Sequence, residues 1–199
     1  MHIISHRRNS IEQLISTPQH YGIEVDIRSH GDRLTIHHDA FVEGDDFRAW
    51  LDHYRHGTLI ANVKEEGLEE RLLALFAERG ITDFFLLDQS FPFLVKWSKL
   101  GEHRCAVRVS EFESCETALN LAGKVDWVWV DCFTCFWLNT LDARRLEKAG
   151  FKLCLVSPEL QGRPAETEIP DLISLLKDRR ITAAAVCTKR PDLWEEAGL

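Results

Sequence analysis

Short runs rich in β-branched and aromatic residues alternate with longer amphipathic runs along the whole sequence. This alternation is typical of βα units built around a parallel sheet. Eight such runs can be counted: HIISH, GIEVDIR, TLIANVK, DFFLLD, RCAVRVS, WVWVDCF, FKLCLVS and TAAAVCT. Eight is the number of parallel strands that closes a barrel, although a doubly wound sheet is also compatible with the alternation itself. We therefore predict an α/β fold and, within it, a single (β/α)8 TIM barrel.

The segments between these strands carry helix and turn signals. Residues 68–79 and 141–149 each place apolar side chains on one face and are followed by a glycine, which predicts two helices. Pro170 predicts the first turn of another helix, which continues through DLISLLKDR. RLTIHHD (33–39) predicts a short extra strand or hairpin arm, and DFRAWLDHYRHG (46–57) a short helical segment.

Length and composition limit the class of protein. With 199 residues and 45% hydrophobic content, the chain can bury one substantial core, so we expect residues 1–199 to form one domain. The sequence shows no apolar run long enough to cross a membrane and no secretory signal, which predicts a cytoplasmic protein. The six cysteines are expected to be free thiols. A net charge of −8 argues against nucleic acid as a partner, whereas a small phosphorylated substrate stays compatible with it. The oligomeric state stays open.

Each predicted strand ends in polar residues, and in a barrel these ends meet on one face, where such enzymes place their sites. They are His6, Glu24 with Asp26, Asn62 with Lys64, Asp88, Arg108, Asp131, Ser157 and Thr188. A strand that leaves a core ends in polar residues in any case, and this ordinary interpretation is preferred for Asp88, Ser157 and Thr188. The first three strands end in a histidine, a pair of carboxylates, and an amide with a lysine, and this ordinary interpretation explains those residues less well.

Glu24 and Asp26 stand two apart in a predicted strand, so their carboxylates emerge on the same face, opposite Val25 and its apolar neighbours. Two like charges placed in this way need a cation, and hard oxygen ligands suit Ca²⁺ or Mg²⁺ better than Zn²⁺. The alternative is an exposed edge strand with solvated acids.

Two histidine sites lie in the same part of the chain. His6 follows the first predicted strand, and His37 and His38 follow a short apolar run. Because adjacent residues of a strand point in opposite directions, at most one of His37 and His38 should face a site. Two histidines on either side of a phosphodiester would make an acid and base pair, whereas a single histidine is equally compatible with an ordinary polar role.

The order of these motifs resembles the signature of the glycerophosphodiester phosphodiesterase family. ISHRR, GIEVDIR and LTIHHD resemble, in this order, the family's His-Arg after the first strand, its Glu-x-Asp and its His-Asp. ANVK, DQSF and AAAVCTKRPDLW resemble the family's third strand, its Ser-Phe after the fourth strand and its closing strand, which extends the resemblance from His6 to Trp194. The chain is also similar to short barrel proteins of the wider superfamily that includes the phosphatidylinositol-specific phospholipases C.

The resemblance implies a metal-dependent phosphodiester hydrolase with a two-histidine acid and base mechanism that passes through a cyclic phosphate. It implies Ca²⁺ or Mg²⁺ as the cofactor and a small-molecule phosphodiester as the partner. The residues that it assigns are His6 and His38 for catalysis, Glu24, Asp26 and Asn62 for the metal, and Arg7 and Lys64 for the phosphate.

Three departures from the family pattern bear on this prediction. Residues 8–12 replace the usual Gly and Pro-Glu-Asn-Thr-like stretch, Asn62 replaces the third glutamate of the metal site, and the usual insertion after His-Asp is almost absent. An amide oxygen can still coordinate Ca²⁺ or Mg²⁺, with one negative charge fewer. The alternatives are a barrel that binds a phosphorylated ligand or carbohydrate without turnover, and a sugar-phosphate enzyme on the same scaffold.

The segment WVWVDCFTCFW stands out for its aromatic content. Trp127 and Trp129 alternate with valines, which predicts a strand packed on both faces. The alternative is that Phe133, Phe136 or Trp137 form an apolar wall for the substrate. Cys132 and Cys135 lack a second pair of ligands, so zinc or redox chemistry is not favoured.

Overall fold

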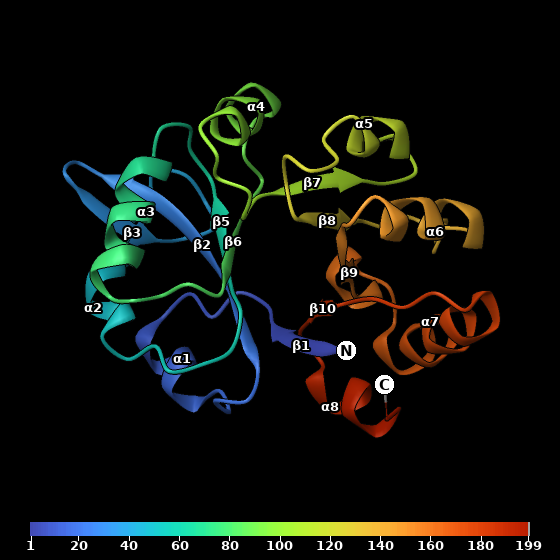
Figure 1. The fold of residues 1–199 in the computed structure, drawn as a ribbon. Helices are drawn as coiled ribbons and strands as arrows, with labels where there is room; N and C mark the ends of the chain where they lie inside the picture. Colours follow the sequence, from blue (N-terminus) through green and yellow to red (C-terminus); the bar gives the residue numbers. More distant parts are fainter. Residues whose placement is uncertain (199) are drawn as a thin grey trace.

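A computed structural model describes residues 1–198 of the chain. All eight predicted strands are present and are parallel to their neighbours (Figure 1). Their bounds are β1 (His2–Ser5), β2 (Gly22–His30), β5 (Leu59–Val63), β6 (Phe84–Leu87), β7 (Ala106–Val109), β8 (Trp127–Val130), β9 (Lys152–Val156) and β10 (Ala185–Thr188). The prediction of an α/β fold with a parallel sheet is confirmed.

The strands form a strongly curled sheet in which the ends of the chain meet, because β1 pairs with both β2 and β10. Ladders of paired residues join β2 to β5, β5 to β6, and β7 through β8 and β9 to β10. The contact between β6 and β7 is different, since it consists of one isolated bridge between Leu86 and Cys105. We call this contact the β6–β7 seam. The closed barrel predicted above depends on this seam and stays a prediction.

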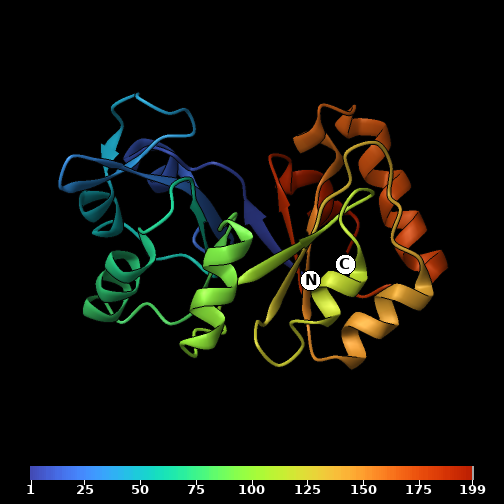
Figure 2. The same ribbon diagram turned by 90° about the horizontal axis from the view of Figure 1, so that it is seen from above.

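The helices lie outside the curled sheet, with α1 to α4 around its first strands and α5 to α8 around its last (Figures 1 and 2). Their bounds are α1 (Ile11–Ser16), α2 (Phe47–Leu51), α3 (Glu69–Glu78), α4 (Phe91–Lys99), α5 (Cys115–Leu119), α6 (Thr140–Lys148), the 3-10 helix η1 (Pro158–Gln161), α7 (Ala165–Arg179) and α8 (Pro191–Glu196). The helices predicted over 68–79 and 141–149 are confirmed to within one residue at each end.

The prediction that a helix begins at Pro170 is wrong, because α7 begins at Ala165 and contains Pro170 inside it. Proline removes the backbone hydrogen bond to the carbonyl four residues earlier, here that of Glu166. Pro170 is exposed, so water can hydrate this carbonyl and the helix continues.

The predicted extra strand is β3 (Arg33–Ile36), which pairs antiparallel with β2 after a turn at Gly31, where φ is 58°. The two-residue strand β4 (Asp45–Asp46) extends this arm. Between β3 and β4 a loop at 37–44 carries both predicted histidines of this region.

Alternation along the strands produces two apolar layers. The outer layer packs against the helices and contains Val128 and Val130 of β8. The inner layer, inside the curled sheet, contains Trp127 and Trp129, so the predicted packing of this strand on both faces is confirmed. Phe85 of β6 stacks on Trp127 at a centroid distance of 4.5 Å.

None of the six cysteines, all within residues 1–198, is in a disulfide, which confirms the prediction of free thiols; five are buried and Cys135 is exposed. No helix in this part of the chain is long and apolar enough to cross a membrane.

Candidate active site

A cavity of about 260 Å³ lies at the C-terminal ends of the parallel strands. Its lining includes six of the seven predicted site residues, namely His6, Arg7, Glu24, His38, Asn62 and Lys64. The seventh, Asp26, is fully buried and reaches the cavity wall through its ion pair with Lys64. The structure therefore brings the predicted residues together, while their roles stay predictions.

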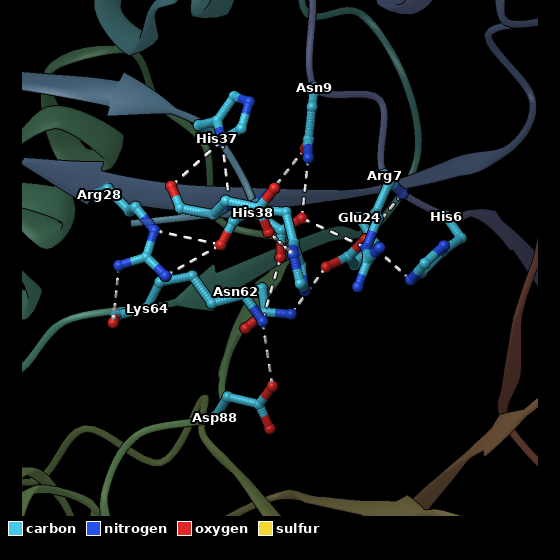
Figure 3. A network of polar contacts seen from close by, with 12 residues as sticks. His6, Arg7, Asn9, Glu24, Arg28, His37, His38, Asn62, Lys64 and Asp88 are labelled. Atoms are coloured by element: carbon cyan, nitrogen blue, oxygen red, sulfur yellow. Dashed lines mark hydrogen bonds and ion pairs between the residues drawn. The ribbon is translucent and has the colours of Figure 1, made fainter. Parts of the chain in front are cut away.

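Glu24 and Asp26 alternate along β2 with Ile23, Val25 and Ile27 of the outer layer, so both point to the opposite side, and both side chains are buried. The alternative of an exposed edge strand is wrong, because β2 is paired with β1 and β3 on one side and with β5 on the other. Asn62 Nδ2 donates a hydrogen bond of 2.9 Å to Glu24 Oε1, and the Arg7 backbone N–H donates one of 2.7 Å to Glu24 Oε2 (Figure 3). Burial, reinforced by the charge of Asp26, raises the pKa of Glu24.

Asp26 is held by three side chains. Asn9 Nδ2 donates to Asp26 Oδ2 at 2.8 Å, and the Asp26 backbone N–H donates back to Asn9 Oδ1 at 3.0 Å. Lys64 Nζ lies 3.1 Å from Asp26 Oδ1, and Arg7 Nε lies 3.5 Å from Asp26 Oδ2. Two positive charges thus compensate a carboxylate that has no access to water.

The donor atoms in this region fit a hard divalent cation. Asn62 Oδ1 and Asp26 Oδ1 are buried and accept no hydrogen bond, and Glu24 supplies a further carboxylate beside them. An all-oxygen set of this kind suits Ca²⁺ or Mg²⁺. Within residues 1–198 no three His, Cys, Asp or Glu side chains cluster as a metal site, so the third ligand would be the amide of Asn62. Such an ion would share Asp26 with Lys64, whose ammonium also lies 3.5 Å from Asp88.

His6 lies against the carboxylates, with Nε2 3.7 Å from Glu24 Oε2. Burial lowers the pKa of His6 to about 3, and the positive charges of Arg7 and Lys189 act in the same direction. The ring is therefore neutral at pH 7 in this arrangement.

His38 faces the cavity from the loop between β3 and β4. Its Nδ1 lies 2.8 Å from Asp39 Oδ1, and its backbone carbonyl accepts hydrogen bonds of 3.2 and 2.9 Å from the Arg28 guanidinium. His37 does not line the cavity, and its Nδ1 faces the backbone of Asp39 instead (Figure 3). His38 lines the cavity and His37 does not, as predicted, but the reason given for it is wrong, because the two residues lie in the loop after β3 and not in a strand.

The other wall of the cavity comes from later strands. Arg108 forms ion pairs with Asp88 and, at 3.6 Å, with Asp131, whose Oδ1 accepts a hydrogen bond of 2.7 Å from Gln161 Nε2. The apolar part of this wall consists of Leu87, Trp129, Phe133, Val156 and Leu160. Of the three aromatic residues considered above for this role, Phe133 lines the cavity. Phe136 packs in the outer layer, and Trp137 packs against that layer.

Two cavity residues have a left-handed backbone, with φ of 50° at Arg7 and 60° at Asp88. Residues other than glycine rarely adopt this conformation, and it tends to persist where the surroundings hold a functional group in place. At Arg7 it allows the backbone N–H and the guanidinium to meet Glu24 and Asp26 respectively.

The sequence did not identify Asn9, Gln161 or Lys189 as site residues. Asn9 lies in the segment that departs from the family pattern, and its contact with Asp26 spans 17 positions. Lys189 and Gln161 line the cavity from strand-end segments near the other end of the chain. Lys189 follows a predicted strand and lies within AAAVCTKRPDLW, but neither signal separates a site residue from an ordinary polar one.

The fold and the cavity together define a class of α/β proteins with eight parallel strands and charged residues at their C-terminal ends. Solved structures of glycerophosphodiester phosphodiesterases share this fold. A provisionally named glycerophosphoryl diester phosphodiesterase from Agrobacterium tumefaciens superposes with a TM-score of 0.73 at 11% identity, covering 100% of this chain and 97% of the other. A glycerophosphodiester phosphodiesterase from the same organism gives 0.67 at 15% identity, covering 100% and 99%.

A glycerophosphoryl diester phosphodiesterase from Parabacteroides distasonis gives a TM-score of 0.64 at 13% identity, covering 98% of this chain and 85% of the other. No protein-family model and no curated protein matches the sequence. The similarity is therefore one of fold, and it extends over the whole chain.

Proposed function

We propose that this protein is a metal-dependent phosphodiester hydrolase that acts on a small-molecule phosphodiester. The observation that carries the proposal is the single cavity shared by two histidines, two basic residues and a buried carboxylate and amide, in a fold also found in glycerophosphodiester phosphodiesterases. Arg7 and Lys64 would bind the phosphate, Arg7 with its planar guanidinium and Lys64 as a point charge.

His6 and His38 would divide the proton transfers. A substrate hydroxyl attacks phosphorus as one histidine accepts its proton, while the other histidine protonates the leaving alcohol oxygen. The product is a cyclic phosphate, which water then opens. Glu24, Asp26 and Asn62 would hold Ca²⁺ or Mg²⁺, which supplies Lewis-acid stabilisation of the phosphate charge when bound. Lys64 offsets the same charge and is itself held in place by Asp26 and Asp88.

The test is turnover of glycerophosphodiesters, whose glycerol carries the attacking hydroxyl, with EDTA, Ca²⁺ and Mg²⁺ in separate arms. Replacing His6 or His38 with alanine should lower kcat by roughly a hundredfold or more. His37→Ala is the matched control, because His37 adjoins His38 in the chain but does not line the cavity. Tight metal binding without turnover of any diester would favour a non-catalytic barrel that binds a phosphorylated ligand or sugar phosphate.

We also propose that the curled sheet closes as a (β/α)8 barrel and that residues 1–199 form one domain in the cytoplasm. Closure is supported by the hydrogen bond of 2.8 Å that the Leu86 N–H donates to the Arg104 carbonyl across the β6–β7 seam. Slow hydrogen exchange at the Leu86 amide would agree with closure, and a single cooperative unfolding transition would agree with one domain. Rapid exchange at this amide would show that the seam is open.

A further inference from the structure

A second cavity lies beside the β6–β7 seam and has a volume of about 710 Å³. It is bounded by β6 and α4 on one side and by β7 and α5 on the other (Figure 1). We call it the seam cleft and define it by Leu87, Phe91, Leu94, Arg108, Phe112 and Thr117. It lies where the curled sheet has one isolated bridge instead of a ladder.

The seam cleft adjoins the cavity of the candidate active site, which we call the catalytic cavity. Leu87, Asp88 and Arg108 line both. Phe112 of the cleft lies 6.0 Å, between ring centroids, from Phe133 of the catalytic cavity. An aromatic path thus leads from the proposed phosphate site to the cleft.

Most polar residues of the cleft are engaged with other protein groups, whereas Gln89 Oε1 accepts no hydrogen bond. Asp88 is paired with Arg108 and Lys64, Glu113 accepts a hydrogen bond from Ser110, and Ser114 caps α5. The phenylalanines differ from them, because 51% of Phe91 and 78% of Phe112 is exposed. Large exposed apolar side chains that flank a cavity mark a surface suited to an apolar ligand.

The size of the catalytic cavity also favours the seam cleft as the place where part of a ligand binds. Sites for small molecules generally occupy about 300 to 1,000 Å³. The catalytic cavity, at about 260 Å³, is below this range, whereas the seam cleft lies within it. The seam cleft, which shares Asp88 and Arg108 with the catalytic cavity, therefore offers a larger group of the substrate more room than the catalytic cavity itself.

We propose that the seam cleft binds the leaving alcohol of the substrate and that this alcohol carries an alkyl or acyl chain. The proposal rests on the phosphodiesterase function and deepens it, since it names the chemical class of the substrate. The chain leaves the catalytic cavity past Phe133 and packs on Phe112 and Phe91.

The experiment compares three glycerol phosphodiesters that share the glycerol phosphate and differ in the second alcohol: ethanol, decanol or glucose. The expected kcat/KM, measured below the critical micelle concentration, is roughly tenfold higher for the decyl than for the ethyl compound, which corresponds to burying about two methylene groups. The glucosyl compound should show no such gain. Equal values for the ethyl and decyl compounds, or a preference for glucose, would overturn the proposal.

Two phenylalanine variants test whether the seam cleft causes the higher kcat/KM of the decyl compound. Phe112→Ser should remove most of the decyl gain and change ethyl turnover much less than decyl turnover, and Phe91→Ser should act in the same way. Leu100→Ser is the matched control, because Leu100 is a similarly exposed apolar residue at the other end of α4 and lies outside the cleft. A uniform loss with all three substrates in Phe112→Ser would contradict the assignment.

Binding separates this inference from the function on which it rests. Calorimetry with decyl phosphate and ethyl phosphate requires no turnover, and decyl phosphate should bind roughly tenfold more tightly in a manner that depends on Phe112. If this holds while no diester is hydrolysed, the proposed hydrolase fails and the assignment of the cleft stands. If diesters are hydrolysed but the two phosphates bind equally, the cleft assignment alone is wrong.

Discussion

The first four and the last four parallel strands of the curled sheet contribute differently to the cavity of the candidate active site. The strands β1, β2, β5 and β6 bring its charged network, in which Glu24, Asp26 and Lys64 are buried or nearly so. The strands β7 to β10 bring mainly a wall, with Trp129 and Phe133 as its aromatic part. In the proposed hydrolase, one half would therefore supply the reactive groups and the other half the shape in which they act.

The sharpest test of this division uses one lysine from each half. Lys64 and Lys189 both line the cavity, but Lys64 lies between two carboxylates and Lys189 is exposed. Lys64→Met should lower kcat about a hundredfold, because a preorganised charge in a buried site is worth far more than one in water. Lys189→Met should cost less than about tenfold. Steady-state kinetics on a glycerophosphodiester, with melting temperatures as a check on folding, would decide, and equal losses would refute the division.

Asn9 tests whether the first half depends on its internal support. In Asn9→Ala, Asp26 loses two hydrogen bonds, each worth about 1 kcal/mol, and we expect roughly a tenfold loss of kcat together with weaker binding of Ca²⁺ or Mg²⁺ in calorimetry. Asn139→Ala is the matched control, since it removes the N-terminal cap of α6 at similar cost in stability and should leave kcat unchanged. An unchanged metal affinity in Asn9→Ala would show that Asn9 is not needed at the site.

The wall of the second half should affect binding more than chemistry. Phe133→Leu reduces the apolar surface of the cavity without touching the charged network, so KM should rise by about threefold to tenfold while kcat stays within about twofold. Phe41→Leu, at an exposed phenylalanine that does not line the cavity, should change neither. A fall in kcat comparable to that in Lys64→Met would place Phe133 in the chemistry itself.

The smallest expected effect concerns how the wall is held. The Glu111 carboxylate accepts backbone hydrogen bonds of 3.1, 2.8 and 3.2 Å from Phe133, Thr134 and Cys135. Although partial burial favours the neutral acid, these hydrogen bonds outweigh it and lower the pKa of Glu111 to about 2. Because the pKa of Glu111 is lower in the folded protein, the ionised carboxylate stabilises the fold at pH values above 4.5, the usual pKa of glutamate. This stabilisation is lost as the pH falls towards 2.

Glu111→Gln should therefore have a slightly lower melting temperature than the parent protein at pH 7, and the difference should shrink as the pH is lowered from 4.5 to 2. Thermal unfolding followed by circular dichroism measures this. A difference that stays constant with pH would mean that the charge of Glu111 does not hold the segment.

What could be predicted from the sequence follows the range of the interactions involved. The eight strands and the shared face of Glu24 and Asp26 are local properties of alternation, and the structure agrees with both. The start of α7 was wrong because proline is a weak boundary signal when its side of the helix faces water. These are features of single segments.

The contacts of Asn9 and Gln161 could not be predicted, because each joins segments that only the assembled sheet brings together. The weak contact between β6 and β7 is of the same kind. Both strands are ordinary in sequence, and their separation depends on how the surrounding strands curl. The site residues from the first 64 positions resembled a family signature, whereas the wall from the second half had no such signal.

The pairing of β1 with β10 has a consequence for biosynthesis. The backbone N–H of His6 donates to the carbonyl of Thr188, so the strand that presents this histidine is completed only by the last strand of the sheet. At usual rates of translation, the ribosome makes Thr188 roughly ten to forty seconds after His6. A nascent chain therefore has no assembled site until β10 has been synthesised, and the proposed hydrolytic activity should arise only after that point.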